Sequence, residues 1–105
     1  MSIKEIEQEA ENRLELNALP DTIKKAIVKK TLWKNDSKDK RCLYVEFEVS
    51  EITGEPQIFT QKYSPMHLEE LKKAMLALNI ESLDGQTLKL KLTKFHIGNA
   101  RMIPV

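Results

Sequence analysis

The sequence predicts a mostly β domain with two helices and five strands. Three features predict it: apolar and polar residues alternate over residues 42–50 and again over 88–93, and a Ser-Pro helix start lies between these segments. The chain has 105 residues, a length that fits one domain with a modest core. Its single cysteine excludes an internal disulfide and a cysteine-rich zinc module.

Residues 3–16 are expected to form an amphipathic helix at the N-terminus. Ser2 and Glu5 have the spacing of a capping box. Apolar residues then recur at helical spacing, at Ile3, Ile6, Ala10 and Leu14. A Leu-Pro-Asp break at residues 19–21 follows, so residues 1–18 are treated as a helical extension and residues 19–105 as the main domain.

Three strands are expected before the second helix. Residues 23–34 allow two interpretations: their apolar spacing would suit a helix face, but their β-branched residues favour a strand, which we adopt. A polar loop over residues 34–40 leads to the clearest strand, residues 42–50. Its expected core face is Leu43, Val45, Phe47 and Val49. After a turn at Thr53-Gly54-Glu55-Pro56, residues 57–63 are expected to form the return strand.

The second helix is expected to begin at Ser64, the cap, and Pro65, the first helical residue. Its expected buried stripe is Leu68, Leu71, Met75 and Leu78. An Asp-Gly turn leads to a fourth strand over residues 88–93, and a Gly-Asn turn leads to a fifth over residues 100–105.

Charge is unevenly distributed along the chain. The formal net charge is +1, but residues 1–20 carry −3 and residues 21–45 carry +5. A local positive field of this kind favours encounter with polyanions. A well-solvated Lys/Glu-rich surface, as in heat-adapted proteins, is the alternative explanation.

The order of three strands, a helix and two strands resembles the OB-fold, a five-stranded, partly open barrel that binds oligonucleotides. Three motifs carry a further resemblance: Leu43-Tyr44-Val45-Glu46-Phe47, Leu71-x-x-Ala74-x-x-Ala77-Leu78, and Leu83-Asp84-Gly85-Gln86-Thr87-Leu88-Lys89-Leu90. Through them, residues 19–105 are similar to small single-stranded-DNA-binding proteins of archaeal and phage type. The resemblance implies an OB-like barrel domain and a role in DNA replication or repair.

That resemblance implies a binding site on the second and third strands and on the loop between the first and second. Single strands, of DNA or RNA, need basic side chains along the phosphates and exposed rings on which bases stack. The candidates are Trp33, Lys34, Lys38, Lys40, Arg41, Tyr44, Phe59, Lys62, Tyr63 and Arg101. The aromatic candidates could instead be core residues, the basic loop could be merely solvated, and Arg101 could pair with Glu46 or Glu48.

No catalytic constellation stands out, so we expect no enzymatic activity and no cofactor. His67 and His96 lack metal partners at helix or hairpin spacing, and His67, in a first helical turn, is expected to be exposed. The three glycines do not form a phosphate-binding loop. No apolar run approaches the roughly 18 residues of a membrane helix, so a cytoplasmic protein with no membrane partner is expected.

The alternative function is that of a protein-interaction or assembly subunit. The acidic helix expected at residues 3–16 has a narrow apolar stripe, which suits docking onto a partner or self-association. The low net charge and few aromatic residues favour this reading. Both functions can coexist in one chain.

Overall fold

The computed structural model describes Leu16, residues 19–96 and residues 99–105. The helix expected at residues 3–16, and the extension over residues 1–18, lie outside this part of the chain except for Leu16.

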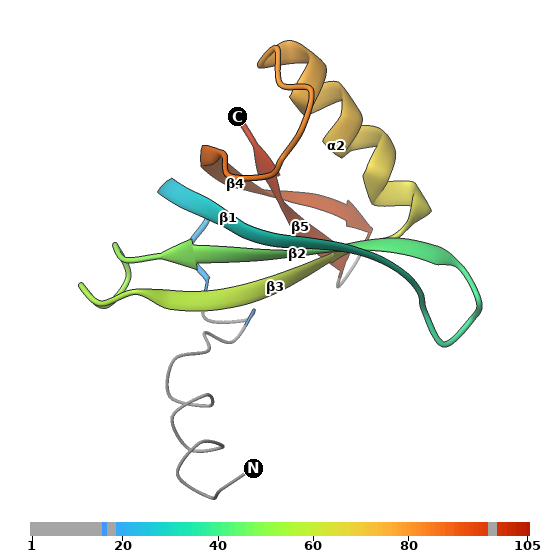
Figure 1. Ribbon diagram of the computed structural model, residues 1–105, viewed down its shortest axis with the longest axis horizontal. Helices are drawn as coiled ribbons and strands as arrows, with labels where there is room; N and C mark the ends of the chain where they lie inside the picture. The colour runs from blue at the N-terminus through green and yellow to red at the C-terminus, as the bar shows by residue number, and fades with distance from the viewer. Residues whose placement is uncertain (1–15, 17–18, 97–98) are drawn as a thin grey trace, which may run out of the picture.

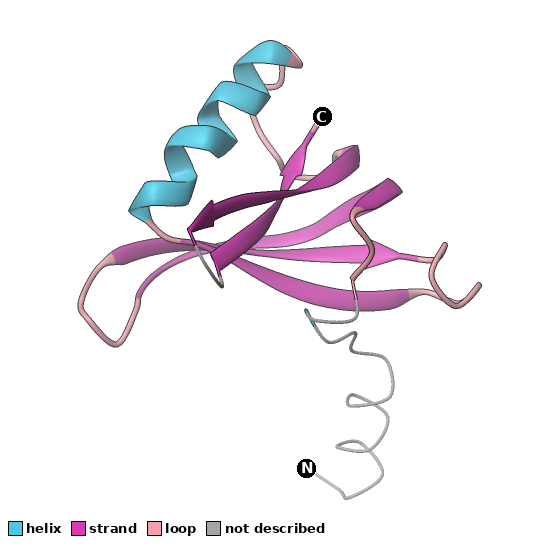
Figure 2. Ribbon diagram, turned by 180° about the vertical axis from the view of Figure 1, so that it is seen from behind, coloured by secondary structure: helices cyan, strands magenta, loops and turns pink. Residues whose placement is uncertain are grey.

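The described residues form five antiparallel strands and one α-helix. In chain order they are β1 (Thr22–Asn35), β2 (Arg41–Val49), β3 (Gln57–Tyr63), α2 (Pro65–Ala77), β4 (Thr87–His96) and β5 (Asn99–Pro104). The element order over residues 19–105 is therefore the predicted one, although the described part has one helix where the whole chain was expected to have two. The sheet curls into a half-barrel, and α2 lies on one side of it (Figures 1 and 2).

The strand order across the sheet is β3-β2-β1-β4-β5. The interpretation of residues 23–34 as a strand is confirmed, since β1 is the 14-residue central strand. Its first half pairs with β4 and its second half with β2. Register shifts occur between Ile23 and Ala26 and between Val28 and Lys30. Bulges of this kind bend and twist a strand, which lets one long strand serve both halves of a curled sheet.

The core lies inside the curl and follows the alternation of the strands. The predicted inner face of β2 is buried, and the Phe47 ring stacks on Phe59 with centroids 5.2 Å apart. Ile23 and Leu90 are completely buried on β1 and β4, and Met102 on β5. The edge strands β3 and β5 are joined by side chains: Tyr63 bonds to the Met102 carbonyl, and Arg101 to the Lys62 carbonyl.

The helix α2 begins as predicted, with Ser64 at the cap and Pro65 in the first turn. Its buried stripe is narrower than predicted. Leu71 is buried and Leu68 and Met75 are partly buried, but Leu78 is 38% exposed. The packed stripe therefore ends before Leu78, which is the C-cap residue of the helix.

His67 corrects a prediction, because it is buried with 1% of its surface exposed. As the third residue of α2 it turns back toward the cap, where Nδ1 accepts from the backbone N–H of Ser64 at 3.0 Å. Its Nε2 lies 3.1 Å from Asn99 Oδ1, and its ring packs edge-on against Phe95. The ring thus joins the start of α2 to β4 and β5, which sequence position alone did not indicate.

The described residues contain neither a candidate membrane-spanning helix nor a candidate metal-binding cluster. None of their helices is long and apolar enough to cross a membrane. Within the same residues, no three His, Cys, Asp or Glu side chains are grouped so that they could hold a metal ion.

Candidate functional site

The β1–β2 hairpin gathers most of the predicted site residues. Its register places Trp33 opposite Leu43, and Lys34 opposite Cys42. The last pair, Asn35 and Arg41, leads into the connecting loop. The antiparallel pairing therefore brings together the site residues that flank the loop in sequence, namely Trp33, Lys34, Arg41 and Tyr44.

Each exposed ring of the hairpin has a cation over it. The Lys34 Nζ lies 5.2 Å from the centre of the Tyr44 ring, and the Arg41 Cζ lies 5.2 Å from the centre of the Trp33 ring. Both are diagonal cross-strand contacts, which long side chains can span. Trp33 is 48% exposed and Tyr44 is partly exposed. Each aromatic–cation pair therefore combines a stacking surface with a positive charge.

The two rings lie on opposite faces of the hairpin. Trp33 shares a face with Leu43 and lines a groove against α2. Tyr44 shares the outer face with Lys30, Leu32 and Lys34. The structure therefore brings the two aromatic candidates to the same hairpin but not to the same surface.

The outer face holds a shallow pocket of about 160 Å³. Its lining residues come from β1, β2 and β3: Lys30, Leu32, Lys34, Tyr44, Glu46 and Thr60. Sequence analysis missed Lys30 and Leu32 as site residues. The signal was present, because Lys30, Leu32 and Lys34 occupy every second position of β1 after the bulge and therefore share one face.

Acidic side chains partly offset the positive charge of this face. Glu46 lines the pocket beside the lysines and would repel a phosphate. Glu48 is engaged by Lys29, with Nζ and Oε2 3.8 Å apart. The outer pocket therefore places two lysines, Lys30 and Lys34, beside one carboxylate, Glu46.

Asp36 organises the loop of the hairpin. Its Oδ1 accepts hydrogen bonds from the backbone N–H groups of Lys38 and Lys40, each at 2.9 Å. Its Oδ2 lies 3.3 Å from the Nζ of Lys62 on β3. The Lys40 backbone bond is the largest cause that lowers the pKa of Asp36 to about 2, helped by the bonds from Lys38 and Lys62. Sequence analysis missed Asp36 because its role depends on the folded loop.

The structure corrects the prediction for Phe59 and Tyr63, which are both buried on the inner face of β3. A buried ring offers no surface to a base, so these two residues are not stacking platforms. The alternation of β3 places Gln61 on the same face. Gln61 is itself buried, and its Oε1 accepts from the backbone N–H of Met102 at 3.1 Å.

Arg101 and Lys62 are engaged by structural contacts, although Lys62 lies directly opposite Tyr44 in the β2–β3 register. The Arg101 Nε donates to the Lys62 carbonyl at 2.6 Å, and Nη1 donates to Asn99 Oδ1 and to the Ala100 carbonyl. Its partners are thus those of the β3–β5 seam rather than the suggested Glu46 or Glu48. The Lys62 ammonium is engaged by Asp36.

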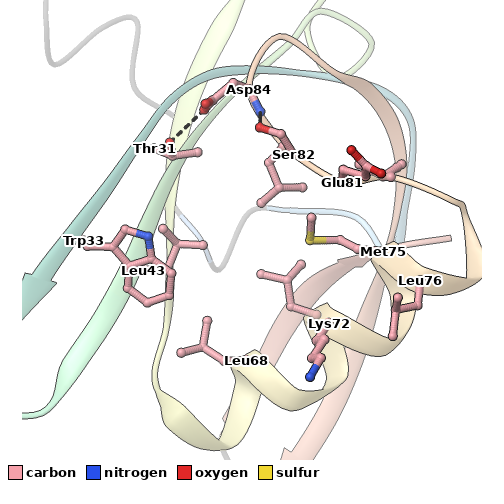
Figure 3. Close-up of a pocket in the computed structure, with 13 residues that line it drawn as sticks. Thr31, Trp33, Leu43, Leu68, Lys72, Met75, Leu76, Glu81, Ser82 and Asp84 are labelled. Carbon is pink, nitrogen blue, oxygen red and sulfur yellow. Dashed lines mark hydrogen bonds between the residues drawn. The ribbon is translucent and has the colours of Figure 1, made fainter.

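A larger groove of about 650 Å³ opens on the Trp33 side of the hairpin. Figure 3 shows Trp33 and Leu43 on one wall, with Leu68 and Met75 of α2 on the other. The residue Leu76, 70% exposed, also lines it. The Thr31 hydroxyl donates to Asp84 Oδ1 at 2.8 Å and ties β1 to the loop before β4. The groove is mostly apolar, with charged groups at its margins.

Comparisons of the chain with protein families, with curated proteins and with solved structures found no match.

Proposed function

We propose that residues 19–105 are an OB-type barrel that binds single-stranded nucleic acid at the β1–β2 hairpin. The observation that carries this proposal is the pair of ring–cation contacts, Lys34 over Tyr44 and Arg41 over Trp33. Single-strand binding combines stacked bases with neutralised phosphates, and both elements occur here side by side. The β3-β2-β1-β4-β5 strand order, with α2 between β3 and β4, supports the OB assignment.

The position of the rings suggests the path of the strand. Because Trp33 and Tyr44 lie on opposite faces, a strand that contacts both must cross the end of the hairpin. That end carries three exposed cations, Lys38, Lys40 and Arg41. Phosphates crossing there would meet positive charge between the two stacking surfaces.

The free energy of base stacking on two rings is too small to account for a micromolar affinity. Each base stacked on an aromatic ring contributes roughly 1–3 kcal/mol. A micromolar complex needs about 8 kcal/mol. Two rings therefore account for part of such an affinity, and the lysines and Arg41 must supply the rest through phosphate contacts. Binding should accordingly weaken as salt rises.

The test is a fluorescence titration of Trp33, the sole tryptophan, with an unlabelled thymine oligonucleotide at low and at physiological salt. Saturable quenching that weakens with salt supports the proposal. The Arg41→Ala variant should bind more weakly, whereas Lys89→Ala, which removes an exposed lysine on β4, should bind as the wild type does. No spectral change together with no gel shift would overturn the proposal.

Protein docking is a second candidate function, favoured by the apolar groove and the exposed Leu76. An assembly subunit would bury this surface against a second copy or a partner. Light scattering tests self-association: a dimer mass that Leu76→Ser reduces to that of a monomer supports it, and a monomer mass for both proteins counts against it.

A further inference from the structure

The carboxylate of Asp36 holds the backbone of the β1–β2 loop, while that of Asp39 accepts from the Asn35 side chain at 2.9 Å. Asp36 Oδ1 accepts from the backbone N–H groups of Lys38 and Lys40. Around it, the Asp36 N–H donates to the Lys40 carbonyl at 2.8 Å, and the Asp39 N–H donates to the Asp36 carbonyl at 3.0 Å. Asp39 takes a left-handed backbone conformation, with φ at 60°. An Asp whose side chain bonds backbone amides two and four residues ahead is a local turn former.

The same carboxylate opposes the charge of the proposed interface. By charge alone, Asp36 lowers the affinity of the hairpin for phosphate. Its Oδ2 also engages Lys62 at 3.3 Å, which withholds that ammonium from a ligand. A carboxylate in such a position is unfavourable for anion binding unless it serves the site in another way.

The hydrogen bonds of Asp36 can serve the site because they order the loop. The two amide bonds fix the backbone at Lys38 and Lys40 and set the course of the chain into Arg41, which begins β2. A loop held in one conformation loses less entropy when it binds than a flexible loop does. The side chains of Lys38 and Lys40 are exposed, so the bonds constrain their backbone and leave their ammonium groups accessible.

We propose that Asp36 is a positioning residue of the single-strand site, which presents the cations of the loop through its two amide bonds and restrains Lys62 through its charge. This inference rests on the proposed function. Asp36 then has two opposite effects on affinity. Its charge weakens phosphate binding, and its amide bonds strengthen binding because they hold the loop in one conformation.

Two neutral variants separate the effects. Asp36→Asn keeps a side-chain oxygen at the same distance from the backbone, so it preserves the acceptor for the two amides, removes the charge and frees Lys62. Asp36→Ala removes the charge and the acceptor together. We expect the Asn variant to bind a thymine oligonucleotide severalfold more tightly than the wild type, and the Ala variant severalfold more weakly.

Loop order gives a second readout, from hydrogen exchange at the amides of Lys38 and Lys40. Protection should persist in Asp36→Asn and fall in Asp36→Ala. Asp36→Gln, whose amide is one methylene longer and fits the turn poorly, should behave as the Ala variant does and replaces it if that variant does not fold. The matched control is Asp39→Asn, which removes a charge from the same loop while keeping the bonds of Asp36; it should bind at least as tightly as the wild type.

The outcomes are distinguishable. If the Ala and Gln variants bind as tightly as Asp36→Asn, charge alone governs affinity and the positioning role is overturned, while the proposed function stands. If the wild-type protein binds no oligonucleotide, the proposed function and this inference both fail.

Discussion

The hydroxyl of Tyr63 donates a 2.6 Å hydrogen bond to the backbone carbonyl of Met102, and this bond is buried. It joins β3 to β5, the two edge strands of the sheet. Together with the Gln61 and Arg101 bonds, it closes the curled sheet where the described strands share no backbone ladder. The seam therefore depends on specific side chains, which makes it a sensitive point for stability.

Replacing Tyr63 with Phe should destabilise the fold by about 1–2 kcal/mol, because it removes a buried hydrogen bond without leaving a large cavity. Urea unfolding measures the change. Tyr44→Phe is the control and should stay within about 0.5 kcal/mol of the wild type, since Tyr44 is on the outer face. Equal stability of Tyr63→Phe and the wild type would mean that the seam does not depend on this bond.

Alkaline pH should weaken the fold through the same residue. Burial raises the pKa of the Tyr63 phenol well above its ordinary value, with a smaller opposing influence of Arg101. In the unfolded chain the phenol ionises near its usual pKa of about 10. The unfolded state therefore releases the proton first, and the stability from Tyr63 is present below about pH 10 and declines above it.

Thermal unfolding between pH 8 and pH 11, an interval chosen around the usual tyrosine pKa of about 10, tests this prediction. The stability advantage of the wild type over Tyr63→Phe should shrink as pH rises, because the Phe variant has no phenol to ionise. A constant difference over this interval would contradict it. Effects of other titrating groups are common to both proteins and cancel in the comparison.

Acid should loosen the hairpin loop through Asp36. Its pKa is lowered from 3.8 to about 2, so the folded state loses protons more readily than the unfolded chain does. Its contribution to stability is therefore present above about pH 4 and is lost as pH falls toward about 2. An NMR titration of the Lys38 and Lys40 amide shifts should report this low pKa, and an apparent value near 4 would contradict it.

Neutralising Glu46 should strengthen the nucleic-acid binding that we propose. Its carboxylate lines the outer pocket beside the lysines and repels phosphate, so Glu46→Gln should improve affinity by roughly 0.5–1 kcal/mol at low salt. Anisotropy of a labelled oligonucleotide measures the change. Glu69→Gln, on the exposed surface of α2, is the matched control and should have little effect. An unchanged affinity for Glu46→Gln would place the phosphates away from this face.

Removing the Trp33 ring should weaken binding by roughly 1–3 kcal/mol, the contribution of one stacked base. Trp33→Ala tests this in a gel shift, and Trp33→Phe should retain most of the affinity because it keeps a stacking surface. If Trp33→Ala binds with the same affinity as the wild type, Trp33 is not part of the site. Both variants keep the buried core, since Trp33 is half-exposed.

Over residues 19–105, the element order and most boundaries followed from local patterns in the sequence. The alternation in β2, the Ser64–Pro65 start of α2 and the turn residues each act within a few positions, so they can be recognised without knowing the fold. The concentration of cations in residues 21–45 also marked the hairpin before its geometry was known.

Tertiary structure alone decided which face of β3 is inside and which side chains join the two edge strands of the curled sheet. Alternation assigns Phe59, Gln61 and Tyr63 to one face but does not say whether that face is wet. Gln61 lies inside because its oxygen meets an N–H group 41 residues away, on β5. The burial of His67 against Phe95 and the bonds of Asp36 to the folded loop have the same origin. A polar side chain is buried where the folded chain supplies a partner, and partners distant in sequence leave no local pattern.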